Sequence, residues 1–153
     1  MLFCVQAGFS GIESESGDFW IGPCVETSFY NHSDLSYGGG FALGYGRGLS
    51  IGVKTLWFHS LNGLDVLELN FLLRFYLSGK NAYSRSFIQF SGGPALLFGD
   101  ETSVSFPAKT GAFSVGLGYG WRFLIKDRWF IEPSVRVGYP YLGAFGICTG
   151  MRF

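Results

Sequence analysis

Alternation of side-chain type near the end of the chain limits the possible folds more than any other feature. Between Trp129 and Tyr139, large apolar residues occupy every second position, and the positions between them carry mostly small or charged residues. The segment from Leu142 to Phe153 repeats this pattern. Because successive side chains of a β-strand point to opposite faces, each segment predicts a strand with one apolar face and one face of small or charged groups.

The same alternation recurs from Phe19 onward, interrupted by polar or glycine-containing stretches that are typical of turns. It predicts eight strands, at residues 19–31, 37–46, 50–58, 64–77, 83–98, 109–125, 129–139 and 142–153. We expect residues 1–18 to form an N-terminal tail or a processed start, and residues 19–153 to form a single domain. The expected fold class is all-β, an eight-stranded antiparallel up-and-down transmembrane β-barrel.

The chemistry of the two faces favours a membrane barrel over a soluble one. In residues 37–46 the apolar face alternates with glycine and alanine, where a water-facing strand would carry lysine, glutamate or threonine. Small interior residues suit an eight-stranded barrel, whose lumen is just wide enough to be filled by side chains. The apolar face is therefore expected to meet lipid, and the core of a soluble β-sandwich is the alternative.

Composition excludes two classes of protein. Only 14% of the residues are charged and the formal net charge is zero, so no basic excess exists to neutralise the phosphates of a nucleic acid. No uninterrupted apolar run approaches the roughly 18 residues that a membrane-spanning helix needs. Nucleic acid is therefore not an expected partner, and spanning helices are not an expected structure.

Aromatic residues gather near the expected strand ends, as they do at the two interfaces of a bilayer. One predicted belt, at the rim where the first strand begins, contains Phe19, Trp121 and Trp129. The other predicted belt contains Phe29, Trp57, Tyr139 and Tyr141.

Charged residues fall on the interior face of the expected strands. By alternation they are Glu26, Lys54, Glu68, Arg74, Arg122, Glu132, Arg136 and Arg152. The lengths of the connections place Arg122 opposite Glu132 and bring Lys54 near Glu68. An isolated charge in a narrow lumen is very costly, so we expect these residues to pair into a structural plug. A gated path for ions or small solutes is the alternative.

Cysteines and prolines raise two local questions. If the first and last strands pair, Cys24 and Cys148 lie on the interior face at about the same distance from one rim. They are then either small buried filler or a disulfide. Pro23 and the run Gly92-Gly93-Pro94 predict bulges or irregular edges, because proline donates no backbone hydrogen bond.

The strand pattern over residues 19–153, together with the ending Ile147-Cys148-Thr149-Gly150-Met151-Arg152-Phe153, resembles the small outer-membrane barrels of the OmpA transmembrane, OmpX and opacity-protein type. The ending looks like the signal that the outer-membrane assembly machinery reads, with Phe145, Ile147, Met151 and Phe153 as its apolar positions. The resemblance implies the outer membrane of a diderm bacterium as location. It implies outer-membrane lipid, the assembly machinery and a host or surface ligand as partners.

The resemblance also implies a structural, surface-contact or host-interaction role, with no catalytic residue, metal or cofactor. A narrow pore or a carrier of small hydrophobic solutes is the alternative function. A lipid-modifying barrel enzyme is a third hypothesis, because His32-Ser33 and His59-Ser60 lie in neighbouring connections and a histidine can activate a serine nucleophile.

Overall fold

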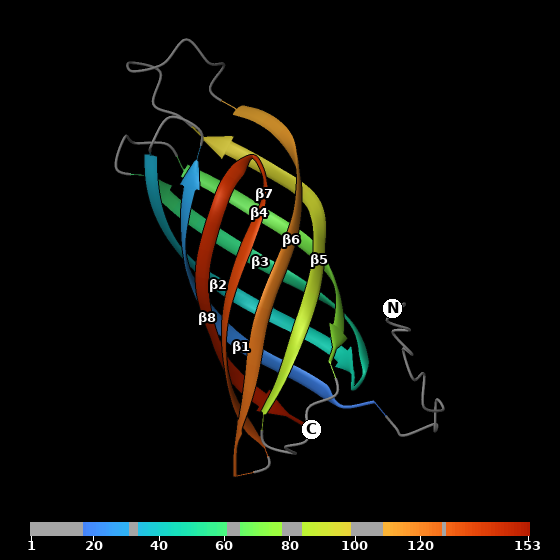
Figure 1. Cartoon of the computed structure of the whole chain (residues 1–153). Coiled ribbons are helices and arrows are strands. Elements are labelled where there is room, and N and C mark those ends of the chain that lie inside the picture. Colours follow the sequence, from blue (N-terminus) through green and yellow to red (C-terminus); the bar gives the residue numbers. More distant parts are fainter. Residues whose placement is uncertain (1–16, 31–33, 61–64, 78–83, 99–108, 127) are drawn as a thin grey trace, which may run out of the picture.

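The computed structural model describes residues 17–30, 34–60, 65–77, 84–98, 109–126 and 128–153. They form a closed antiparallel barrel in which each strand pairs with the next and β8 pairs with β1 (Figure 1). The strands are β1 (Phe19–Tyr30), β2 (Asp34–Gly46), β3 (Leu49–Ser60), β4 (Asp65–Tyr76), β5 (Ser84–Phe98), β6 (Lys109–Ile125), β7 (Trp129–Tyr139) and β8 (Tyr141–Arg152). The eight-stranded antiparallel barrel predicted from alternation is confirmed.

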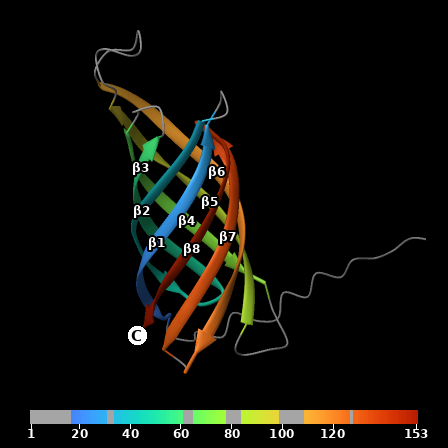
Figure 2. The same cartoon turned by 90° about the vertical axis from the view of Figure 1, so that its left-hand side faces the viewer.

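The barrel has two rims, termed lower and upper from their place in Figure 1. At the lower rim β1 begins and β8 ends, and two backbone hydrogen bonds join Phe19 and Phe153, with N to O distances of 3.2 and 2.8 Å. The two views in Figures 1 and 2 show the strands winding obliquely around the wall. Of the predicted tail, residues 1–16 lie outside the described part of the chain.

Two strands extend further toward the upper rim than the alternation predicts. β2 begins at Asp34 instead of Tyr37, because residues 34–36 pair with residues 28–30 of β1. β3 reaches Ser60 instead of Phe58, and Ser60 lies opposite Ser36 of β2. Polar residues mark a turn by composition, but here the register of a neighbouring strand recruits them into the sheet.

No bulge lies at Pro23 or Pro94, but the irregular edge that was the other expectation at Pro23 is present. The β5–β6 register runs without a shift through Gly93 and Pro94, and the β1–β2 register runs without a shift through Pro23. Each proline instead drops out of the ladder on its other side: Pro23 from the ladder with β8, and Pro94 from the ladder with β4. Each ladder lacks two successive pairs at this point, Gly22 and Pro23 in one and Gly93 and Pro94 in the other, so the missing N–H interrupts the pairing without inserting a residue.

A register shift does occur where β8 begins, and it corrects one residue of the upper belt. Phe29 of β1 lies opposite Gly143, but the next residue, Tyr30, lies opposite Tyr141. The extra residue turns the Tyr141 side chain into the barrel, where it is fully buried. The prediction that Tyr141 belongs to an aromatic belt is therefore wrong.

The two faces of the wall differ in the way the alternation predicts. Among the described residues, 34 large hydrophobic side chains are exposed on the outside, while the buried set contains seven charged side chains. The remaining belt residues all point outward and are between 41 and 62% exposed: Phe19, Phe29, Trp57, Trp121, Trp129 and Tyr139. No helix in the described ranges is long and apolar enough to cross a membrane.

Interior glycines make room for large side chains. A Cβ built at Gly44 would lie 2.5 Å from the ring of Trp20, and one built at Gly120 would lie 2.5 Å from the ring of Phe87. Both distances are far below van der Waals contact. The small residues on the interior face therefore have a packing reason, since the lumen has no space for a side chain at every position.

Candidate functional site in the barrel interior

The interior charges form two networks, one above the other along the barrel. We term the upper network the set Glu26, Lys54, Glu68, Asn70, Ser114 and Arg136. Lys54 Nζ donates to Glu26 at 2.6 Å, and Arg136 bonds both carboxylates: its Nε donates to Glu26, and its Nη2 donates to Glu68 at 2.9 Å. Asn70 Nδ2 donates to Glu68 at 3.0 Å. Two cations thus face two carboxylates, and the network is neutral.

The lower network consists of Arg74, Gln89, Arg122 and Glu132. Arg74 Nη1 donates to one oxygen of Glu132 at 2.9 Å, and Arg122 Nε donates to the other at 2.5 Å. Arg74 Nε also donates to Gln89 at 2.7 Å. Two cations here face one carboxylate, so the network carries one surplus positive charge. Nη2 of Arg122 is buried without a hydrogen-bond partner among the described residues.

Aromatic rings surround the guanidinium groups of the lower network. The Trp20 ring contacts both of them, with its centroid 4.5 Å from Arg74 Cζ and 4.9 Å from Arg122 Cζ. Phe130 lies 4.3 Å from Arg122 Cζ, and Phe87 lies 4.8 Å from Arg74 Cζ. The negative face of an aromatic ring attracts a cation, and such a contact contributes about 2 kcal/mol when it is desolvated. The rings therefore compensate the charge that lacks a carboxylate.

The two predicted pairings and the predicted interior position of Arg152 have different outcomes. Arg122 and Glu132 lie together, as their spacing across the β6–β7 connection suggests. Lys54 lies opposite Asn70, two residues from Glu68, and its ion pair is with Glu26, because β3 continues to Ser60 and the register moves by two residues. Arg152 lies outside both networks, at the lower rim, with Nη1 3.2 Å from Asp18.

Several interior residues were not among the predicted site residues. Trp20, Gln89, Asn70 and Ser114 all lie on the interior face by the same alternation that identified the charged residues. The signal was present, since each occupies an inward position of its strand. The sequence does not show how close two side chains come when their strands are far apart along the chain, as Arg74 and Glu132 are.

A covalent bond also crosses the interior face of the β1–β8 seam. Cys24 and Cys148 lie opposite each other in the register and form a disulfide. Of the two alternatives for these cysteines, the structure contains the disulfide. It joins the strands that close the barrel.

Of the two histidines that suggested a lipid-modifying enzyme, His59 lies at the upper rim, on the outer face. His59 Nδ1 is 2.6 Å from Asp65 Oδ1, and its ring lies 5.9 Å from the ring of Tyr37. His32 and Ser33 lie outside the described residues, as does the side chain of Ser60. Within the described ranges no group of three histidine, cysteine, aspartate or glutamate side chains could hold a metal ion.

The two networks fill the lumen with paired or ring-stacked charges, and each charged member is at most 7% exposed. Such groups are costly to separate, because each would leave a buried charge without compensation. The arrangement can therefore hold the strands in register and block the lumen. It offers no exposed nucleophile or acid–base pair to a substrate.

Comparison with known proteins identifies similar structures. Neither a protein-family model nor a curated protein matches the sequence of the chain. The N-terminal β-barrel domain of Pseudomonas aeruginosa OprF matches over 89% of this chain and 97% of its own, at 15% identity and a TM-score of 0.64. Neisserial surface protein A matches over 90% and 96%, at 7% identity and a TM-score of 0.69.

Ail, the attachment invasion locus protein of Yersinia pestis, matches over 91% of this chain and 99% of its own, at 16% identity and a TM-score of 0.56. At such identities the likeness lies in the fold. The chain therefore has the fold of the small eight-stranded outer-membrane barrels.

Proposed function

We propose that the protein is an integral outer-membrane barrel with a closed interior, which acts through its surfaces in a structural, surface-contact or host-interaction role. The observation that carries the proposal is the inversion of the two faces, with the apolar side chains outside and the paired charges inside. In water this arrangement would expose the apolar wall and bury the charges at a large cost. In a bilayer it satisfies both faces.

Refolding into lipid vesicles tests the proposal. The refolded protein should migrate faster on a denaturing gel before boiling than after it, because a closed barrel resists the detergent and stays compact. Equal migration of the two samples, together with good solubility in plain buffer, would contradict a membrane location and make the apolar outer wall an interface of a soluble protein.

The outward side chains of β8 support the proposed assembly signal. Phe145, Ile147 and Phe153 are 50, 37 and 70% exposed, and Met151 lies between them on the same face. Phe153→Ala should lower the amount of folded protein in the outer membrane of an expressing cell, while refolding of the purified variant into vesicles stays efficient. Unchanged membrane levels would exclude Phe153 from the signal.

For the surface contact we propose the upper rim, where residues 99–108 form the longest connection of the sequence. Ail, one of the similar structures, is an attachment protein by its name. Replacement of residues 99–108 by a glycine-serine segment of equal length should abolish adherence of cells that display the protein, with the gel shift retained. Equal adherence of both strains would contradict this contact.

A narrow pore is the second candidate, favoured by the surplus positive charge of the lower network and by Arg122 Nη2. The proposed closed interior predicts no current above that of the bare bilayer in planar membranes. A steady current with anion preference would support the pore instead. Uptake of a small hydrophobic compound by protein-loaded vesicles would support a carrier.

A further inference from the structure

The disulfide between Cys24 and Cys148 lies inside the barrel, between the two charge networks. Its cysteines are 2 and 4% exposed. Glu26, the next interior residue of β1 toward the upper rim, belongs to the upper network. Glu132 of the lower network lies opposite Cys148 in the register of β7 and β8. A reagent that enters the lumen from either rim therefore meets a network before it meets the bond.

Packed side chains fill the lumen below the bond. The Trp20 ring contacts the guanidinium groups of Arg74 and Arg122. Phe130 meets the same ring edge to face, with the ring centroids 6.1 Å apart. All four side chains are buried. Because a close-packed interior contains few voids larger than a water molecule, a peptide-sized reagent has no path from the lower rim.

The upper network closes the lumen above the bond. Lys54 and Arg136 both donate to Glu26. The ring centroid of the buried Tyr141 lies 3.9 Å from Arg136 Cζ. A Cβ built at Gly146, which lies opposite Glu26, would be 3.2 Å from Glu26 Cγ. The route from the upper rim is therefore closed as well.

The wall beside the bond is also closed, although the ladder of β1 and β8 lacks the pairs of Gly22 and Pro23. A Cβ built at Gly22 would lie 1.8 Å from the carbonyl oxygen of Thr149, and one built at Gly150 would lie 2.3 Å from that of Ile21. The two backbones are thus in close contact at this point, and the interrupted pairing leaves no opening.

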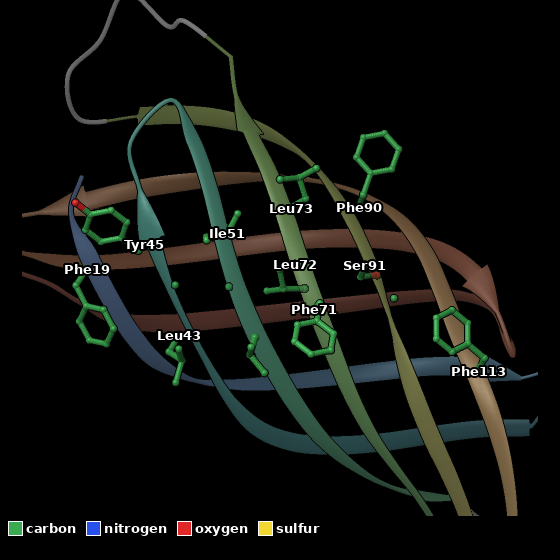
Figure 3. A pocket seen from close by; sticks show the side chains of 14 residues that line it. Phe19, Leu43, Tyr45, Ile51, Phe71, Leu72, Leu73, Phe90, Ser91 and Phe113 are labelled. Atoms are coloured by element: carbon green, nitrogen blue, oxygen red, sulfur yellow. The ribbon is translucent and has the colours of Figure 1, made fainter. Parts of the chain in front are cut away.

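An apolar hollow of about 690 Å³ indents the outer wall from β1 to β6, but it does not reach the bond. Phe19 and Tyr45 lie at one end of it and Phe113 lies at the other (Figure 3), and neither cysteine lines it. In the closed barrel the two sulfur atoms are therefore shielded from both rims and from the lipid side.

We propose that the two thiols are oxidised before the barrel closes, by a dithiol oxidant that acts on the unfolded or partly folded chain. One cysteine thiolate attacks the oxidant's disulfide, which gives a mixed disulfide and releases one oxidant thiolate. The second cysteine thiolate attacks the sulfur of the first and releases the other oxidant thiolate. The oxidant is thereby reduced to a dithiol and takes up the two protons. The first step needs direct contact between the sulfur atoms, which the closed barrel prevents.

The chain then enters assembly with its first and last strands already joined. The periplasm is the compartment that supplies such an oxidant, and this part of the inference rests on the proposed outer-membrane location. The order of oxidation and closure rests on the burial of the bond alone.

Oxidation of the purified, reduced chain before and after folding tests this order. A Cys4→Ser background removes the third cysteine. One sample is unfolded in urea, and the other is folded in detergent micelles, where faster gel migration before boiling identifies the barrel. With oxidised glutathione the folded sample should lose its thiols about 100-fold or more slowly, because only a transiently opened fraction reacts. Equal rates would overturn the proposal.

Phe19→Cys with Phe153→Cys, in a chain that carries Cys24→Ala and Cys148→Ala, is the matched control. Two backbone hydrogen bonds join these positions in the same seam, and their side chains are 41 and 70% exposed. A hydrogen-bonded pair has Cα atoms about 5.5 Å apart, which a disulfide can bridge. This pair should react nearly as fast in the barrel as in urea. Equal slowness of both pairs would mean that the micelle excludes the oxidant, and would overturn the proposal.

A reduced chain that cannot fold would itself place oxidation before closure. The oxidised chain then gives the comparison in reverse: tris(carboxyethyl)phosphine should cleave the bond about 100-fold or more slowly in the barrel than in urea. Equally fast cleavage would overturn the proposal.

Pulse labelling of expressing cells, followed by alkylation of thiols and electrophoresis without boiling, tests the order during assembly. The bond should already be present in the unfolded band, and the folded band should contain it from its first appearance. A folded band with two reduced thiols that is oxidised later would overturn the proposal. The gel shift reports the proposed membrane barrel separately, whether or not the bond forms first.

Discussion

In the upper network two carboxylates face two cations, whereas in the lower network a single carboxylate faces two cations. Glu26 and Glu68 share Arg136, and Lys54 completes a neutral set. Glu132 alone faces Arg74 and Arg122, and aromatic rings take the place of a second carboxylate. A narrow lumen can therefore compensate a buried cation either with a carboxylate or with the faces of aromatic rings, and the two solutions should respond differently to substitution.

The largest effect is expected for Glu132→Gln. It removes the only carboxylate that the described residues bring to Arg74 and Arg122, and a buried charge without its partner costs about 5 kcal/mol. Unfolding by urea in lipid vesicles should shift to a lower midpoint. Glu26→Gln is the matched control. It takes the carboxylate from Lys54 but should cost less, because Glu68 remains as one carboxylate for the two cations of the upper network. Equal shifts in the two variants would remove the distinction between the networks.

Arg136→Met should be the next most destabilising change, by about 3 kcal/mol. It takes the guanidinium from between two carboxylates, Glu26 and Glu68, and leaves the upper network with a surplus negative charge. The same urea titration measures the loss. A stability equal to that of the parent protein would mean that the upper network is not held by its charge balance.

Trp20→Leu should cost about 2 kcal/mol, because the ring that contacts both guanidinium groups is lost. A double-mutant cycle with Arg122→Met separates this contact from the loss of packing. Coupling between the two substitutions is the expected result. Strictly additive effects would show that the ring fills space without compensating charge.

Arg122→Met should have the smallest effect, about 1 kcal/mol or less, because it removes the surplus charge and leaves Glu132 paired with Arg74. Comparison with Arg136→Met uses the same chemical change in the two networks. If Arg122→Met destabilises the protein as much as Arg136→Met does, the lower network has no surplus charge to lose.

Most of the fold could be predicted from alternation along the strands, because lipid on one side and a narrow lumen on the other impose opposite demands on successive residues. The inward position of Arg136 and the outward position of Trp129 both follow from it. Strand ends were less predictable. Asp34 belongs to a strand only because β1 continues to Tyr30, and the composition of one segment does not contain the length of its neighbour.

Contacts across the lumen could not be predicted from the sequence, for a related reason. Lys54 bonds Glu26, 28 positions away, and Arg74 bonds Glu132, 58 positions away. Those distances depend on the tilt and register of every strand between them. Tyr141 shows how sensitive this is, since one extra residue at the start of β8 moves its side chain from the outer wall to the interior.

The central claim is that the apolar side chains lie outside the barrel, against lipid, and the charged side chains lie inside it. Quenching of tryptophan fluorescence by brominated acyl chains tests this claim most directly. Two single-tryptophan variants are compared in vesicles, one that keeps only Trp57, which is 48% exposed on the outer wall, and one that keeps only Trp20, which is 1% exposed inside the barrel. The fluorescence of Trp57 should be strongly quenched and that of Trp20 should be nearly unchanged. Equal quenching of the two, or stronger quenching of Trp20, would contradict a barrel whose apolar wall meets lipid.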